Sequence, residues 1–199
     1  MKKILVLISQ GNELMEIAPF TDIFGWNNIV GCEKILVETC SLHSTIHATW
    51  NLQITPEINL MTTKIDVNDY CALVVPGGFG YRGYFNDMKN PLFSHIIQQF
   101  FKNNKIIIGI CTGVIPLGEA GILKNRKATT YLYDNERYFK QLSKYGAISM
   151  KNSIVIDDNL ITVPGPKNAI EVAFYLLEIL TSSENANCVK YNMGFWLKW

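Results

Sequence analysis

The stretch from residue 106 to residue 113 constrains the fold more than any other part of the chain. It reads Ile-Ile-Ile-Gly-Ile-Cys-Thr-Gly, so an apolar strand runs directly into a Gly-x-Cys-x-Gly turn, and a helical segment through residues 117–120 follows. This is the nucleophile-elbow pattern with cysteine in place of serine. The flanking glycines suit a tight turn in which side chains have no room. The pattern predicts that Cys111 points its thiol out of the sheet into a crevice.

The rest of the chain alternates short β-branched runs with helix-length segments. Runs at 4–8, 35–39, 72–75, 106–110, 153–156 and 160–163 predict strands, and four of them are almost wholly apolar, as in a parallel sheet covered on both faces. Segments 91–101 and 168–180 have apolar residues at helical spacing, and in the first the stripe comprises Leu92, His95, Ile96, Gln99 and Phe100. Residues 42–60 predict an antiparallel excursion. The chain is therefore expected to be α/β, with a doubly wound, mainly parallel sheet and helices on both faces.

Length and charge narrow the possible functions. The 199 residues suit a single domain covering 1–199. The net charge of +1 does not indicate electrostatic binding to nucleic acid or to an acidic membrane surface. The N-terminal apolar run is too short for a signal peptide, and no run reaches the length of a membrane span. Five cysteines, with no Cys-x-x-Cys pair, indicate free thiols in a reducing compartment. We expect a cytoplasmic protein without nucleic-acid or membrane partners.

The ligand crevice of such a sheet lies beyond the carboxyl ends of its strands. The Pro-Gly-Gly turn at 76–78 ends one strand and offers backbone N–H groups to an oxyanion. Glu16 follows the first strand and is expected to overhang the crevice. An ionised carboxyl there would raise the pKa of the thiol, whereas a protonated one would donate a hydrogen bond to a thiolate. Position alone does not decide between these two roles, nor does it exclude that Glu16 is a solvated surface acid. We expect Glu13 to be a solvated acid of that kind.

The position of Cys111 at a helix N-terminus favours its thiolate, because free N–H groups and the helix dipole stabilise negative charge. The alternative is an inert thiol that fills space between strand and helix. A metal site is not expected, because His43 and His47 lie in an extended segment with no third ligand. The aromatic residues Tyr191, Phe195, Trp196 and Trp199 predict core packing, a flap or a dimer contact.

These motifs together resemble the ThiJ/PfpI superfamily, the DJ-1-like, class I glutamine-amidotransferase-like proteins, over nearly the whole chain. The matching pieces are Glu16, residues 74–78, the elbow at 109–113, Ala-Gly-Ile-Leu at 120–123, Ala-Thr-Thr at 128–130 and Val-Pro-Gly-Pro at 163–166. The resemblance implies a flavodoxin-like fold, a homodimer, and a reactive Cys111 whose partner carboxyl is Glu16. It also implies an oxyanion site made by the backbone N–H groups of Gly78 and Thr112.

The sequence departs from several branches of that superfamily. Protease- and amidase-like members place His after the cysteine, where this chain has Thr112, and many relatives have His where it has Tyr131. The His-x-Glu of glutamine amidotransferases is missing from residues 164–171. Protease and amidotransferase activities are therefore disfavoured. The Cys-Thr-Gly elbow most resembles isonitrile hydratases, which add water to a carbon–nitrogen triple bond, and the N-terminal domains of AraC-type regulators.

The first hypothesis is a cofactor-free lyase or hydrolase acting on a small molecule. Cys111, Glu16 and Thr112 would be catalytic, and Gly77, Gly78 and Tyr131 would bind the substrate or its oxyanion, with no metal. The second hypothesis is a redox or stress-response protein in which Cys111 is oxidised. The third is a ligand-binding module without catalysis. Fold does not decide among them.

Overall fold

The structure is a computed structural model and describes residues 1–195. A seven-stranded sheet forms its centre. Its strand order is β10-β11-β7-β6-β1-β2-β5, and every neighbouring pair is parallel except β10 with β11. The strands are β1 (Lys2–Leu7), β2 (Ile35–Ser41), β5 (Ile58–Asn59), β6 (Ala72–Val75), β7 (Ile106–Ile110), β10 (Val155–Asp157) and β11 (Leu160–Val163). The predicted doubly wound, mainly parallel sheet is confirmed, and the six predicted strands agree with the structure to within two residues at each end.

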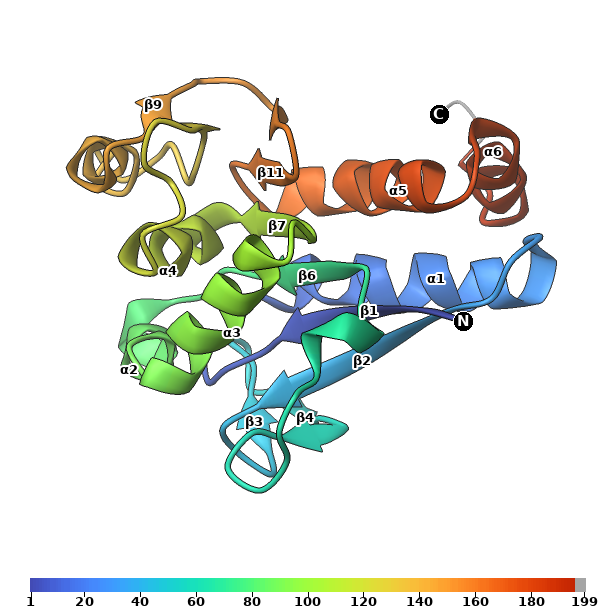
Figure 1. The fold of residues 1–199 in the computed structure, drawn as a ribbon, viewed down its shortest axis with the longest axis horizontal. Coiled ribbons are helices and arrows are strands. Elements are labelled where there is room, and N and C mark those ends of the chain that lie inside the picture. Colours follow the sequence, from blue (N-terminus) through green and yellow to red (C-terminus); the bar gives the residue numbers. More distant parts are fainter. Residues whose placement is uncertain (196–199) are drawn as a thin grey trace.

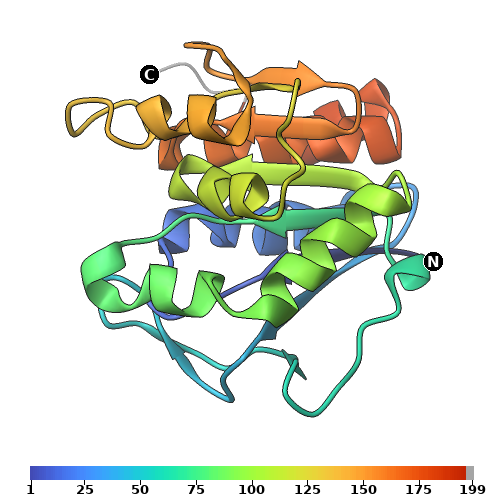
Figure 2. The ribbon, with the colours of Figure 1, turned by 60° about the vertical axis from the view of Figure 1, so that its left-hand side comes forward.

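Helices cover both faces of this sheet (Figures 1 and 2). They are α1 (Ala18–Val30), α2 (Tyr84–Met88), α3 (Pro91–Lys102), α4 (Val114–Glu119), α5 (Ala169–Leu180) and α6 (Ser183–Asn192). Ile4 and Val6 of β1 pack with α1, α5 and α6, whereas Leu5 and Leu7 pack with α3 and α4. Because successive strand residues point to opposite faces, both faces must be apolar. This explains the continuous apolar runs of the sequence.

The apolar stripe of α3 is rotated from the one predicted. Phe93, Ile96, Ile97 and Phe100 are buried, whereas Leu92 is 37% exposed. The helix begins with Pro91 as predicted and ends one residue beyond the predicted end, at Lys102. The error arose because residues 92–101 carry apolar side chains on more than one side, so that spacing alone did not decide which side faces the sheet.

Short elements connect the strands and helices of the central sheet. The antiparallel excursion is confirmed as β3 (Ile46–His47) paired with β4 (Gln53–Ile54), and β8 (Lys127–Ala128) pairs with β9 (Ile148–Ser149) in a further ribbon. The 3₁₀ helices are the three-residue turns η1 (Leu14–Glu16), η2 (Val67–Asp69), η3 (Gly80–Arg82), η4 (Cys111–Gly113) and η6 (Pro166–Asn168), and the longer η5 (Phe139–Tyr145). Within residues 1–195, no helix is both long enough and apolar enough to cross a membrane.

Candidate active site

Cys111 lies on the predicted elbow, between β7 and the short α4. Its φ angle is +53°, in the left-handed region that ordinary residues rarely adopt. A Cβ on Gly113 would lie 2.1 Å from the carbonyl oxygen of Val75, so that only glycine fits between the elbow and the end of β6. The hydroxyl of Thr130 donates a 2.5 Å hydrogen bond to the Cys111 carbonyl oxygen and holds the turn. The backbone strain is therefore fixed by tight packing around Cys111.

Glu16 lies beside this elbow and is fully buried. Its Oε2 accepts a 2.6 Å hydrogen bond from the backbone N–H of Gly77, whereas no described residue hydrogen-bonds to its Oε1. Burial and, to a lesser extent, the charge of nearby Glu13 raise the pKa of Glu16, whereas the Gly77 N–H and the Cys111 thiol lower it, and the net result is a pKa of about 8. This pKa favours the protonated form of Glu16 at neutral pH.

The Cys111 thiol differs from its expected state. Burial raises its pKa well above the usual value, and a charge on Glu16 raises it further, while the backbone N–H of Thr112 lowers it. The predicted lowering by the helix N-terminus is thus outweighed, because the sulfur is desolvated beside a carboxyl. Glu16 and Cys111 act on each other's pKa, so they titrate as a pair and share at most one negative charge near neutral pH.

The glycine turn after β6 joins Glu16 to the elbow. The Gly78 N–H donates to Oγ1 of Thr112 over 2.9 Å, and this hydroxyl is also 2.9 Å from the Gly78 carbonyl oxygen. Asn12 donates to the carbonyl oxygen of Gly77 over 2.7 Å and fixes the turn from the β1 side. Both glycine N–H groups are therefore occupied within the protein, one by Glu16 and the other by Thr112.

A pocket of about 860 Å³ opens above these groups. Of the six predicted site residues, Cys111, Glu16, Thr112, Gly78 and Tyr131 line it, whereas Gly77 lies behind the Glu16 carboxyl. The pocket is also lined by residues that were not predicted from the sequence as site residues: Glu13, Phe85, Tyr133, Asp134, Arg137 and Tyr138. The expectation of a solvated Glu13 is wrong: this side chain is 8% exposed and caps η1.

Four aromatic residues, Phe85, Tyr131, Tyr133 and Tyr138, form one side of the pocket, which we call the aromatic wall. Ring centroids lie 5.7 Å apart for Phe85 and Tyr138, 5.8 Å for Tyr131 and Tyr133, and 6.4 Å for Tyr131 and Tyr138. The guanidinium of Arg137 lies 4.6 Å from the Tyr138 ring centroid and pairs with Asp134 at 3.1 Å. Three tyrosines within eight residues after the Ala-Thr-Thr segment were the signal available in the sequence.

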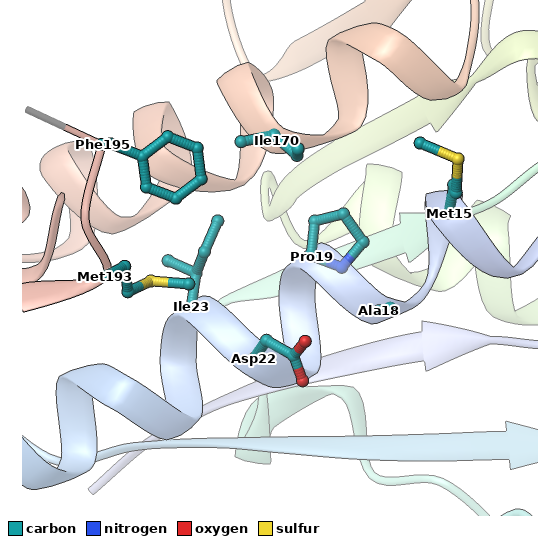
Figure 3. A pocket seen from close by; sticks show the side chains of 8 residues that line it. All are labelled: Met15, Ala18, Pro19, Asp22, Ile23, Ile170, Met193 and Phe195. Carbon is teal, nitrogen blue, oxygen red and sulfur yellow. The ribbon is translucent and has the colours of Figure 1, made fainter. Parts of the chain in front are cut away.

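A second, smaller pocket of about 260 Å³ lies between α1, α5 and the end of α6 (Figure 3). Met15, Pro19, Ile23 and Phe195 contribute to its apolar lining. Phe195 also packs edge-on against Phe174, with ring centroids 5.1 Å apart, so this part of the aromatic tail covers α5. Trp196 and Trp199 lie outside the described residues. Asp22 is the one charged side chain among the described residues that line this pocket.

The two histidines of the excursion do not form a metal pair. His43 contacts the Asp87 carboxylate at 3.0 Å, and His47 is exposed in β3. Across residues 1–195, no three His, Cys, Asp or Glu side chains are grouped so that they could hold a metal ion.

Comparison with known proteins matches residues 2–179 to the DJ-1/PfpI family. An uncharacterised protein of Methanocaldococcus jannaschii is 35% identical over 133 residues, covering 66% of this chain and 62% of that protein. Isonitrile hydratase of Pseudomonas putida is 27% identical over 156 residues, covering 75% of this chain and 65% of the enzyme. The matches therefore span less than two thirds of the length of these two relatives.

The fold is shared with a solved structure. The crystal structure of DJ-1beta from Drosophila melanogaster superposes with a TM-score of 0.81 at 24% identity, covering 100% of this chain and 99% of that one. The flavodoxin-like architecture expected from the resemblance is thus confirmed. The elbow cysteine, its buried carboxyl and the sequence match over residues 2–179 lead to one conclusion: the chain belongs to the DJ-1/PfpI family.

Proposed function

We propose that this protein is a cofactor-free enzyme that adds water to an unsaturated carbon of a small molecule through a covalent Cys111 intermediate. One observation carries the proposal: the buried carboxyl of Glu16, with Oε1 lacking any partner among the described residues, lies beside a thiol that lines a large pocket. A neutral carboxyl of this kind can both give and accept a proton.

In the first step the Cys111 sulfur forms a bond to the electrophilic carbon. With an isonitrile, Glu16 delivers its proton to that carbon and takes up the proton that the thiol loses. The product is a thioimidate, in which carbon carries the sulfur and a double bond to nitrogen. The pair begins and ends neutral, so the buried site never needs to hold two charges.

In the second step water adds to the same carbon. Its hydroxyl group bonds to the carbon and its proton passes to nitrogen, with Glu16 again as the relay. The carbon–sulfur bond then breaks, the thiol recovers its proton, and an N-substituted formamide leaves. The Thr112 N–H, which already acts on the sulfur, would hold charge that develops there. The Gly77 N–H fixes the Glu16 carboxyl.

The test is turnover of benzyl isonitrile to N-benzylformamide. Cys111→Ser should lower kcat/KM by about a thousandfold or more, because a hydroxyl is a far weaker nucleophile than a thiol. Glu16→Gln should lower it by about a hundredfold, since an amide does not relay protons. Cys71→Ser, at a partly buried thiol whose sulfur contacts the Lys3 carbonyl oxygen, is the control and should keep full activity. Full activity in Cys111→Ser would refute the proposal.

The unpartnered Oε1 also favours a second candidate, in which Cys111 senses peroxide. Hydrogen peroxide would transfer one oxygen atom to the sulfur and leave as water, and the Glu16 carboxyl would donate a hydrogen bond to the new sulfenic oxygen. Selective oxidation of Cys111 by mild peroxide, without hydratase turnover, would support this candidate. Uniform oxidation of all five cysteines would exclude it.

A further inference from the structure

The pocket is much larger than the reacting atoms require. Its volume of about 860 Å³ lies near the upper end of the range of roughly 300–1,000 Å³ typical of pockets for drug-sized ligands. Cys111 and Glu16 occupy only one part of it. A substrate of three or four heavy atoms would touch these two groups and leave most of the space unfilled. The remaining volume therefore indicates a substrate with a larger group that does not react.

The aromatic wall determines what kind of group fits there. Phe85, Tyr131 and Tyr138 are half-buried, so their rings are held by neighbours on one side and open to the pocket on the other. They are already packed ring against ring, as the centroid distances of 5.7 and 6.4 Å show. Such a surface offers stacked and edge-on contacts to a planar aromatic group, each worth about 0.5–1.5 kcal/mol beyond area burial.

The charges around the pocket determine what kind of substituent is rejected. Glu13 and Asp134 are the acidic lining residues beside Glu16, and the one basic side chain among the described lining residues is Arg137. Arg137 is already engaged by the Asp134 carboxylate and by the Tyr138 ring. A carboxylated substrate would thus meet Glu13 without a free cation to pair with, and a carboxylate without a partner is costly in a partly desolvated site.

We propose, resting on the hydratase function above, that the aromatic wall is the specificity site. It holds an uncharged aryl group of the substrate and rejects anionic analogues, while the reactive carbon sits at Cys111. Tyr138 is the central contact, because it packs against Phe85 and Tyr131 and carries Arg137 on its ring. Glu13 provides the discrimination against carboxylates.

Binding to Cys111→Ala protein, by calorimetry, tests this without turnover. The probes are N-benzylformamide, N-methylformamide and 4-(formamidomethyl)benzoate. We expect the benzyl compound to bind at least tenfold more tightly than either of the others. Adding Tyr138→Leu should weaken the benzyl compound about tenfold and leave N-methylformamide unchanged. Adding Phe101→Leu, at a partly exposed aromatic residue of α3 outside the pocket, should change nothing.

Adding Glu13→Gln should raise the affinity for the benzoate severalfold, without a change for N-benzylformamide. Equal affinities for all three probes, or a Tyr138→Leu effect no larger than that of Phe101→Leu, would overturn the inference. Because these measurements need no reaction, the two proposals fail separately. Aryl selectivity in a protein that turns over no isonitrile would refute only the hydratase, and turnover without aryl selectivity would refute only the specificity site.

Discussion

Cys111 and Cys40 both lie at the carboxyl ends of parallel strands in the same sheet. Cys40 is the penultimate residue of β2, and Cys111 directly follows β7. Burial raises the pKa of each thiol, and a neighbouring glutamate, Glu57 for Cys40 and Glu16 for Cys111, raises it further. By their titration alone, these two thiols would be grouped together as inert.

Access and the state of the carboxyl separate them. Cys40 is fully buried in extended backbone, and Oε2 of Glu57 is held by the N–H and hydroxyl groups of Thr39 at 2.5 and 2.7 Å. Cys111 opens into a pocket, and Oε1 of Glu16 is unpartnered among the described residues. Under the proposed function, Cys111 is therefore distinguished from Cys40 not by a low pKa but by its opening to the pocket and by the unpartnered carboxyl oxygen beside it.

The largest expected difference between the two thiols is in alkylation by iodoacetamide, followed by mass spectrometry at each cysteine. Cys111 should react at least about a hundredfold faster than Cys40, because Cys40 is reached only when the core opens. The Cys111 midpoint should lie above the free-thiol value of about 8.5, and Glu16→Gln should lower it by removing a neighbouring charge. The exposed Cys32 and Cys188 serve as references. Equal alkylation rates for Cys111 and Cys40 would show that the pocket does not make the Cys111 thiol more accessible than the Cys40 thiol.

The second largest expected effect is on how the free energy of unfolding depends on pH. The Glu16 carboxyl keeps its proton up to a pKa of about 8 in the folded protein, whereas in the unfolded chain it loses that proton near pH 4.5. Stability should therefore fall as pH rises from about 5 to 8, by at most about 1.4 kcal/mol per pH unit from this group, and level off above 8. In urea unfolding, Glu16→Gln should flatten this slope and Cys40→Ser should leave it unchanged. An identical slope in wild type and Glu16→Gln would show that the carboxyl is not desolvated.

The smallest effect concerns two glycines. A Cβ on Gly77 would lie 2.7 Å from Oγ1 of Thr112 and 2.9 Å from Oε2 of Glu16. The added Cβ would also lie 2.8 Å from the backbone nitrogen of Thr112, so either the elbow or the carboxyl must move in Gly77→Ala. We expect a loss of about 1–3 kcal/mol in stability and a changed Cys111 alkylation midpoint. Gly25→Ala is the control, because no atom lies within 4 Å of its added Cβ in α1, and it should stabilise by up to about 1 kcal/mol. An unchanged Cys111 midpoint in Gly77→Ala would show that the position of the Glu16 carboxyl relative to the elbow does not affect the pKa of the Cys111 thiol.

The sequence predicted the sheet, and it predicted that Glu16, the glycine turn after β6 and Cys111 follow strands of that sheet. Both predictions depend on local patterns. Continuous apolar runs mark strands covered on both faces, and the Gly-x-Cys-x-Gly spacing marks the elbow. The burial of Glu13 and the protonation of Glu16 could not be predicted, because both depend on how residues from separate segments exclude water. The raised pKa of Cys111 had the same origin: a helix N-terminus can be read from the sequence, but desolvation cannot.

The aromatic wall was missed for a related reason. Tyr133 and Tyr138 belong to a loop with no regular periodicity, and Phe85 comes from a different segment, on α2. Asp134, Asn135 and Glu136 all have φ angles between +53° and +58°, a left-handed conformation that single Asp and Asn residues favour but that three successive residues, one of them Glu, rarely adopt. Only the folded chain brings the rings together.

The strand order has a consequence for how such a site can change over time. Glu16, the glycine turn and Cys111 follow β1, β6 and β7, which are three consecutive strands of the sheet. Adjacent strands lie about 4.8 Å apart, so the backbone hydrogen bonds of the sheet fix the positions from which these three segments begin. Substitutions in the loops that line the pocket can therefore change which ligand fits, while the strands that carry Glu16, the glycine turn and Cys111 stay in place.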